Sequence, residues 1–241
     1  MKPLALLAAF ALAVPAAPGS PAGPVVVELF TSEGCSSCPP ADELLASLSR
    51  EGVSGVRVVA LSEHVDYWDG PAWRDPFSSR EMTRRQLAYR RVLGIDSAYT
   101  PQAVVNGEAQ LVGSDGPALR AAVLRAARRQ LGTLTLRRTP AGVAVEGAWP
   151  GGRAVVLVAL LEDGLQSAVQ GGENAGRTLR HDGVVRSLAT VGEGDGSFRG
   201  EIALPVPPGP GAFRVLALAQ EGRGGRILAS GQLLRPYAAD P

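Results

Sequence analysis

The chain has 241 residues, 45% of them hydrophobic, and its 24 basic residues nearly balance 23 acidic ones for a net charge of +1. This length supports a sizeable core and more often two domains than one, while the near-neutral charge gives no electrostatic case for binding nucleic acid. Lys2 is the single lysine, which excludes Schiff-base chemistry and lysine-dependent phosphate loops from the rest of the chain.

The N-terminus has the three-part pattern of a secretory signal peptide. Lys2 precedes an uncharged Leu/Ala-rich run at residues 4–14, and small residues and prolines follow. The alternative is a retained anchor, but about 11 apolar residues fall short of the roughly 20 needed to span a bilayer. We therefore predict cleavage of residues 1–22, export to the periplasm or beyond the cell, and no membrane span in the mature chain.

Residues 25–61 have the pattern of a βαβ unit. The continuous apolar run at 25–30 is typical of a strand buried on both faces. A helix over 41–50 follows, with apolar residues three and four apart and Gly52 after its end. A second apolar run at 56–61 predicts a strand, and residues 62–70 then form a polar and aromatic loop at its carboxyl end. Open α/β sheets place their sites at this edge, so His64, Asp66 and Trp68 are candidate groove-lining residues.

Three further elements follow before residue 132. Ser78 and Glu81 form a capping box for a helix reaching about Leu93, whose many arginines we interpret as a solvated face. The pair Asn106-Gly107 between 102–105 and 109–112 predicts a β-hairpin. A last helix is expected over 117–131. The predicted order to this point is β-α-β-α-β-β-α.

Beyond residue 132 the sequence changes to short β-type runs separated by Gly/Pro turns. About seven such strands in about 100 residues are typical of an antiparallel β-sandwich. We therefore predict an α/β domain over 23–132 and a β-sandwich domain over 133–241. The polar loop at 171–177 lacks the spacing and strand-helix context of a nucleotide-binding loop. The predicted strands cover residues 133–137, 143–148, 154–161, 184–191, 198–204, 213–219 and 227–234.

Cys35 and Cys38, the only two cysteines, form a C-x-x-C motif where the first strand gives way to the first helix. This placement is typical of a redox site, and an oxidising compartment lets the pair hold a disulfide. Cys35 fits the accessible attacking thiolate, because a helix N-terminus stabilises negative charge. Cys38, one turn further on, fits the resolving thiol.

Two other interpretations of the cysteine pair remain open. A structural disulfide closing so short a loop stabilises a fold by only about 2 kcal/mol, which makes it a poor staple. Structural zinc requires four ligands, and the other candidates, His64 and His181, are expected in different domains. Copper handling by the pair is a related alternative. His64 itself is interpreted as a hydrogen-bonded loop residue rather than a base.

The motifs resemble those of a family of exported bacterial thioredoxin-like proteins described as a domain of unknown function, within the thioredoxin superfamily. The resemblance covers nearly the whole mature chain and implies that Pro101 is a cis-proline opposite the C-x-x-C pair. Thr100 and Pro101 would then position the substrate strand beside the disulfide. It rests on residues 28–42, residues 64–68, Thr100-Pro101-Gln102 and the Glu173-Asn174 loop.

The chain departs from working thioredoxins at three positions. Gly34 replaces the tryptophan before the first cysteine, and Ser36-Ser37 replaces Gly-Pro. Leu29 stands where thioredoxins carry an acid, and Glu28 next to it points to the opposite face of the strand. Loss of this proton carrier argues against efficient general dithiol reduction.

These observations predict an exported thiol-disulfide oxidoreductase that acts on protein disulfides through Cys35 and Cys38. No bound cofactor or metal is expected beyond the redox-active disulfide, and the partners are protein thiols and an electron-transfer protein. The alternative is a non-catalytic secreted binding module on a thioredoxin-like scaffold.

Overall fold

The computed structural model describes residues 24–129, 132–205 and 212–233. The predicted signal peptide, residues 1–22, lies outside the described residues. Within them the fold is mixed α/β, with one large sheet and three α-helices, and none of these helices is long and apolar enough to cross a membrane. The α/β class predicted from the sequence is therefore confirmed.

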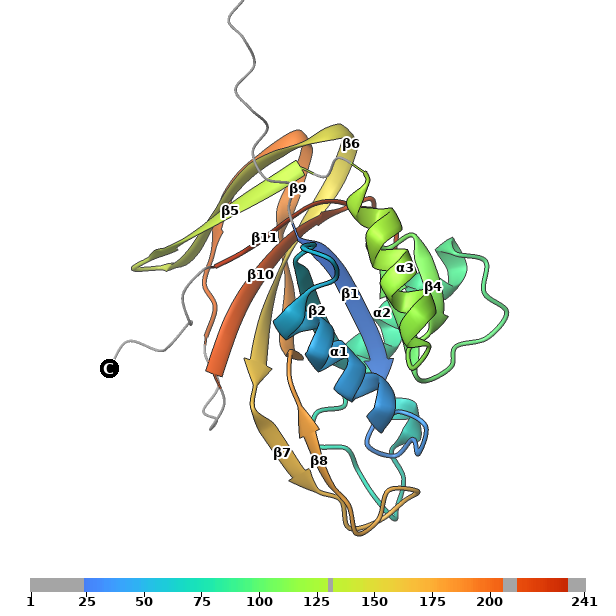
Figure 1. Cartoon of the computed structure of the whole chain (residues 1–241). Coiled ribbons are helices and arrows are strands. Elements are labelled where there is room, and N and C mark those ends of the chain that lie inside the picture. Colours follow the sequence, from blue (N-terminus) through green and yellow to red (C-terminus); the bar gives the residue numbers. More distant parts are fainter. Residues whose placement is uncertain (1–23, 130–131, 206–211, 234–241) are drawn as a thin grey trace, which may run out of the picture.

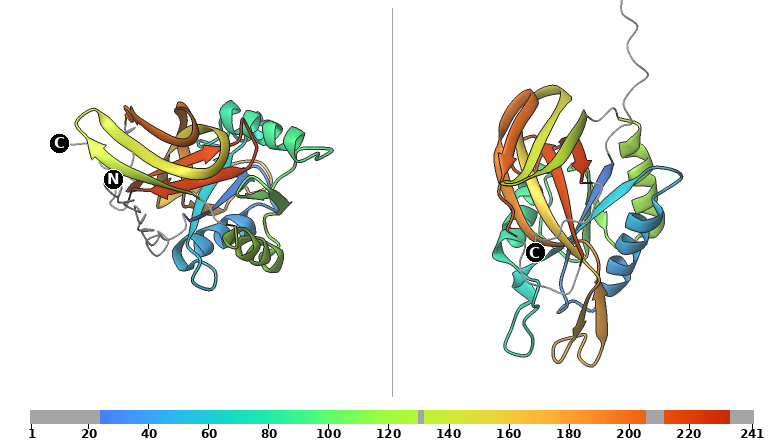
Figure 2. Two further views of the ribbon diagram at one scale, coloured as in Figure 1. Left: turned by 90° about the horizontal axis from the view of Figure 1, so that it is seen from above. Right: turned by 90° about the vertical axis from the view of Figure 1, so that its left-hand side faces the viewer.

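A nine-stranded sheet organises the molecule, in the order β10-β11-β5-β6-β9-β2-β1-β3-β4. Helices α1 and α3 cover one face of its β1–β4 end, and α2 lies on the opposite face (Figures 1 and 2). The elements of the first half are β1 (Val25–Thr31), α1 (Pro39–Glu51), β2 (Val58–His64), the 3-10 turn η1 (Asp66–Trp68), α2 (Arg80–Val92), β3 (Gln102–Val105), β4 (Ala109–Val112) and α3 (Gly116–Ala127).

The first half follows the predicted element order closely. β1 is central and buried along its whole length, parallel to β2 and antiparallel to β3. Its alternate residues Val25, Val27 and Leu29 pack under α1 and α3, while Val26 packs on the opposite side. This double burial explains why the strand is a continuous apolar run. Several boundaries differ from the prediction: Ser79 rather than Ser78 caps α2, β2 spans 58–64 rather than 56–61, and α3 ends at Ala127 rather than at residue 131.

The described part of the second half contributes five strands to the main sheet where the sequence predicted about seven short ones, and two of the five are long, β6 with 22 residues and β9 with 19. The five strands are β5 (Gly132–Thr139), β6 (Gly142–Asp163), β9 (Val184–Ile202), β10 (Ala212–Gln220) and β11 (Ile227–Gln232). Two predicted pairs of strands are each one continuous strand, β6 and β9. A further two-stranded hairpin, β7 (Leu165–Ala168) and β8 (Thr178–His181), was not predicted and projects at one end of the molecule (Figure 1).

The predicted layout of a separate β-sandwich is not confirmed. β6 pairs with β5 at one end and β10 at the other, and β11 joins β10 to β5, so these strands close a ring around an apolar core. β9 continues the same sheet into the first half, where Ser62 of β2 pairs with Val184. A boundary between residues 132 and 133 stays a prediction. It falls at the start of β5.

The sequence predicted that the arginines of α2 form a solvated face, but this is wrong for one of them. Arg85 is buried, with its Nε 2.5 Å from Glu28 Oε2 and 3.3 Å from Glu63 Oε1. Burial, together with the negative charge of Glu28, raises the pKa of Glu63 well above its usual value. Arg85 is therefore the countercharge of a carboxylate in the sheet interior, a role that an i, i+4 pattern on a helix cannot reveal.

We expect Arg85→Met to lower the free energy of unfolding by about 3 kcal/mol or more, because it leaves the Glu28 carboxylate buried and unpaired. Urea denaturation monitored by circular dichroism measures the change. Arg91→Met, at an exposed position of the same helix, is the matched control and should stay within about 0.5 kcal/mol of the wild type. Equal losses in both variants would contradict a structural role for the buried pair.

Candidate functional site

The two cysteines lie where β1 ends and α1 begins. After Thr31 the chain turns, the Cys35 N–H donates to Ser32 O at 3.2 Å, and the Cys38 N–H donates to Cys35 O at 3.2 Å. Cys38 is the N-cap residue of α1, and it forms a disulfide with Cys35 across a Cα–Cα distance of 5.4 Å. The predicted location of the pair at a strand-to-helix junction is therefore observed.

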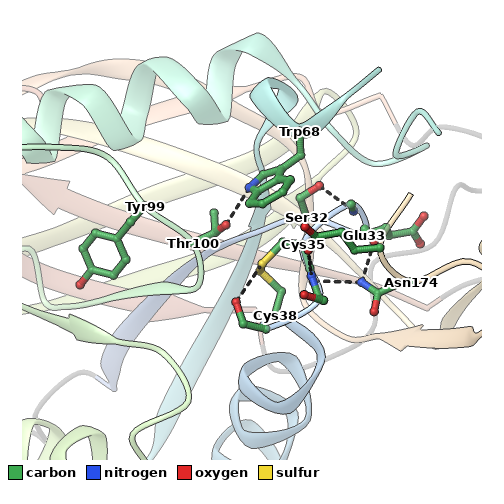
Figure 3. The surroundings of a disulfide bond; sticks show 12 residues. Ser32, Glu33, Cys35, Cys38, Trp68, Tyr99, Thr100 and Asn174 are labelled. Carbon is green, nitrogen blue, oxygen red and sulfur yellow. Dashed lines mark hydrogen bonds between the residues drawn. A yellow bond between two sulfur atoms is a disulfide. The ribbon is translucent and has the colours of Figure 1, made fainter. Parts of the chain in front are cut away.

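The Thr100–Pro101 peptide bond, which leads into β3, is cis, as the resemblance implied. Trp68 of η1 connects it to the cysteine loop, because its Nε1 donates to Thr100 Oγ1 at 2.8 Å and its Cβ lies against Gly34. A Cβ on Gly34 would lie 3.1 Å from that atom, so a larger residue would press on Trp68. Figure 3 shows the disulfide next to Trp68 and Thr100.

Both cysteines are buried, which corrects the expectation that Cys35 is accessible. Cys35 is 1% exposed and Cys38 0%, although Ser36 and Ser37 between them are exposed. The Ser37 hydroxyl lies 3.4 Å from Cys35 Sγ. In this conformation a protein substrate cannot reach either sulfur, because both cysteines are almost completely buried.

The loop between β7 and β8 covers the cysteine loop from the second half of the chain. Asn174, fully buried, donates through Nδ2 to Glu33 O at 2.8 Å and to Cys35 O at 2.9 Å. The Glu173 carboxylate accepts the Ser36 N–H at 2.9 Å, and hydrogen bonding from the Ser36 side chain and from this N–H lowers the pKa of Glu173. Residues 173 and 174 therefore hold the C-x-x-C loop through its backbone, across more than 130 residues of sequence.

Glu33 is the most heavily bonded residue beneath this loop. Its buried carboxylate accepts from Trp73 Nε1 at 3.0 Å and from Ser167 Oγ at 3.1 Å, and it lies 2.9 Å from His181 Nε2. Its N–H donates to Asp75 Oδ2 at 2.9 Å. The partners of Glu33 come from residues 73–75, from β7 and from β8, three segments that no local sequence pattern connects.

His64 and His181 lie side by side, although they come from opposite sides of the predicted domain boundary. Their ring centroids are 4.9 Å apart, and Phe77 packs edge-on against both rings. His64 Nδ1 lies 2.7 Å from Asp75 Oδ2. Although burial raises the pKa of Asp75, the neighbouring His64 and two backbone N–H donors hold it below its usual value. Among the described residues no three His, Cys, Asp or Glu side chains gather as metal ligands.

Of the three candidate groove residues, only Trp68 lies at the disulfide. His64 is the last residue of β2, buried and bonded to Asp75 rather than placed in a loop. Asp66 bonds Thr83 of α2, with its N–H donating to Oγ1 at 3.1 Å and its Oδ1 accepting at 2.6 Å. Asp66 therefore anchors η1 to the helix instead of lining a groove.

Asp42 is a further titratable residue close in sequence to the cysteines, and no role in the site was predicted for it from the sequence. It lies in the first turn of α1, four residues after Cys38 and hence on the same helix face. The residue is half-buried, but its Oδ1 is buried and has no hydrogen-bond partner among the described residues. Burial raises the pKa of Asp42 to about 7, against the lowering effects of His181 and the Thr31 hydroxyl, and Asp75 and Glu33 raise it further.

We expect Asp42→Asn to stabilise the protein at pH 8 and to have little effect at pH 5. A carboxyl whose pKa is raised in the folded state contributes stability below about pH 4 and loses it as the pH rises through about 7. Asparagine cannot ionise, so its melting temperature should exceed that of the wild type by a few degrees only at the higher pH. Differential scanning calorimetry from pH 5 to 8 measures this difference.

The exposed neighbour Glu43→Gln is the control for this prediction. Its difference from the wild type should not change between the two pH values. An Asp42→Asn difference that is the same at pH 5 and pH 8 would show that Asp42 ionises freely in the folded protein.

Comparison with known proteins places the chain among proteins whose descriptions give no activity. A crystal structure of a protein from Agrobacterium tumefaciens, a structural-genomics target, matches with a TM-score of 0.73 and 29% identity over 90% of this chain and 96% of that chain. HBP35 of Porphyromonas gingivalis matches in fold alone, with a TM-score of 0.62 and 18% identity over 93% of this chain and 82% of that chain. No curated protein matches. The model of a family described as "Protein of unknown function (DUF1223)" matches residues 26–220.

Proposed function

The chain belongs to the DUF1223 family of proteins of unknown function, and we propose that it is an exported thiol-disulfide oxidoreductase acting on protein disulfides through Cys35 and Cys38. One observation carries the proposal: a disulfide at the N-terminus of α1 adjoins the cis Thr100–Pro101 bond, with Trp68 in contact with both segments. A disulfide that only stabilises the fold does not require a cis-proline segment beside it.

The topology of the first half supports a thioredoxin-like unit within the larger sheet. The elements follow one another in the order β-α-β-α-β-β-α predicted from the sequence, and the strands lie in the order β2-β1-β3-β4 with a parallel β1–β2 pair and an antiparallel β3–β4 hairpin. The site also lies at the carboxyl end of parallel strands, where open α/β sheets place their ligands. The remaining strands then serve as a support that holds the C-x-x-C loop through Glu173 and Asn174.

The proposed chemistry is two-electron exchange. With the pair reduced, the Cys35 thiolate attacks a substrate disulfide, a Cys35–substrate bond forms, and one substrate thiolate leaves. The Cys38 thiolate then attacks Cys35 Sγ, the intramolecular disulfide reforms, and the second substrate thiolate leaves. Two electrons have passed from the protein dithiol to the substrate. A partner dithiol restores the reduced pair, and the same steps run in reverse when the protein oxidises a substrate dithiol.

Trp68 is the proposed movable cover of this site. It is 38% exposed, so its ring is not locked into the core, and the described residues give its polar atom one bond, to Thr100 Oγ1. Rotation of the ring would open the disulfide and at the same time free Thr100 beside the cis-proline. Substrate binding at Thr100 and Pro101 would thus be coupled to access to the sulfurs.

The decisive experiment is a redox titration with a mass-tagging readout, together with an exchange assay on a protein disulfide. We expect a midpoint above about −300 mV, since structural disulfides lie below that potential. Exchange should be lost in Cys35→Ser, while Cys38→Ala should trap substrates as mixed disulfides. A midpoint below about −300 mV with no exchange in the wild type would overturn the proposal.

We also expect Trp68→Phe to speed reduction of the disulfide by tris(2-carboxyethyl)phosphine about 5-fold, the equivalent of one lost hydrogen bond. Trp68→Ala should react faster still, because it removes the ring as well. Stopped-flow or quenched mass-tag kinetics measures the rates. The free energy of unfolding, determined in parallel, separates local opening from global destabilisation. Rates equal to that of the wild type would exclude Trp68 as the cover.

A second candidate function is a non-catalytic binding module. The burial of both sulfurs favours it, and so does the exposure of Tyr67 (45%) and Trp68 beside them. Such a module would retain its partner in a Cys35→Ala/Cys38→Ala variant and lose it in Tyr67→Ala/Trp68→Ala. An oxidoreductase would instead lose its partner in the Cys35→Ala/Cys38→Ala variant and retain it in Tyr67→Ala/Trp68→Ala.

A further inference from the structure

A pocket of about 370 Å³ lies away from the disulfide, between α2, strands β6 and β9, and the turn that joins β10 to β11. Its volume falls within the range of about 300–1,000 Å³ that small-molecule sites occupy. Neither the cysteine loop nor the residues around Trp68 line it. The proposed redox chemistry therefore makes no use of this pocket.

The floor of the pocket is apolar and is shaped by a break in the strand register. Val155 and Leu157 of β6 and Leu188 of β9 line it, all of them only partly buried. Val156 pairs with Gly192 and Leu157 with Thr190, so Val191 is an extra residue in β9. Such a β-bulge bends a strand and redirects its side chains, and bulges often occur next to binding sites. The bulge thus leaves apolar side chains facing a hollow.

The mouth of the pocket carries an excess of positive charge. Arg84 and Arg223, both exposed, line it from α2 and from the β10–β11 turn, and neither has an ion pair or hydrogen bond among the described residues. Glu81 is the opposing charge at the rim. Arg85 also lines the pocket, but its charge is balanced by Glu28 at 2.5 Å. The two free guanidinium groups are therefore available to an anion.

We propose that this pocket binds an amphiphilic monoanion, specifically a medium-chain alkyl carboxylate, with its tail on Val155, Leu157 and Leu188 and its carboxylate on Arg84 and Arg223. A guanidinium group pairs with a carboxylate through two parallel hydrogen bonds, which fixes the head group. Apolar side chains that remain partly exposed gain stability when a tail covers them. A short soluble anion lacks the tail, and an uncharged chain lacks the head group.

Isothermal titration calorimetry of the purified chain with decanoate, below its micellar concentration, tests the proposal. Arg84→Ala/Arg223→Ala should weaken decanoate binding at least 10-fold and leave decanol binding within 2-fold. Octanoate, which lacks two methylene groups, should bind about 15-fold more weakly than decanoate. Arg91→Ala, on the same helix but outside the pocket, is the matched control and should change nothing.

A second variant separates pocket binding from adsorption to other apolar surface. Thr190→Trp places a ring over the pocket floor from an exposed position, where the fold tolerates substitution. It should weaken decanoate and decanol alike by at least 10-fold. Decanoate affinity that is unchanged in Thr190→Trp, or in Arg84→Ala/Arg223→Ala, would overturn the proposal. An absence of decanoate binding would not change the result of the redox titration of Cys35 and Cys38. The two proposals are therefore tested independently.

Discussion

The buried Glu33 carboxylate is the interaction on which the rest of the site depends. A fully buried carboxylate is tolerated only when hydrogen bonds replace its hydration, and Glu33 obtains them from Trp73, Ser167 and His181. Ser167 and His181 belong to β7 and β8, so these hydrogen bonds tie the segment that leads into the C-x-x-C motif to that hairpin. The candidate redox loop and the second half of the chain are in this way parts of one structure.

Polar groups elsewhere in the sheet follow the same rule. Glu28 on β1 is compensated by Arg85 from α2, and Asp75 by His64. The Glu28–Arg85 pair joins a strand to a helix 57 residues further along the chain, and the His64–Asp75 pair joins a strand to a loop 11 residues further on, so each specifies how these elements pack. Glu63 and Asp42 are the groups left with incomplete compensation, and burial raises the pKa of both. Asp42 is the one that lies on the helix that carries Cys38.

The disulfide is protected as well as positioned. The loop at Glu173 and Asn174 holds the backbone around Cys35, while Trp68 contacts Gly34 and Thr100. A permanently sealed disulfide needs no exposed aromatic ring bonded to the residue before a cis-proline. A permanently open one would not bury both sulfurs. The thiol exchange proposed for this site therefore requires movement of at least one side chain, for which Trp68 is the candidate.

The sequence by itself determined the elements whose signals are local. Continuous apolar runs predicted β1 and β2, apolar periodicity predicted α1, the Asn106-Gly107 turn predicted the β3–β4 hairpin, and the C-x-x-C spacing predicted the location of the disulfide. Only the tertiary structure decided what depends on contacts between distant residues: the single continuous sheet, the burial of Cys35, the burial of Arg85, and the meeting of His64 with His181. Periodicity reports which face of an element is buried. It carries no information about which distant element covers that face, because that choice is made by packing and by the compensation of buried charge.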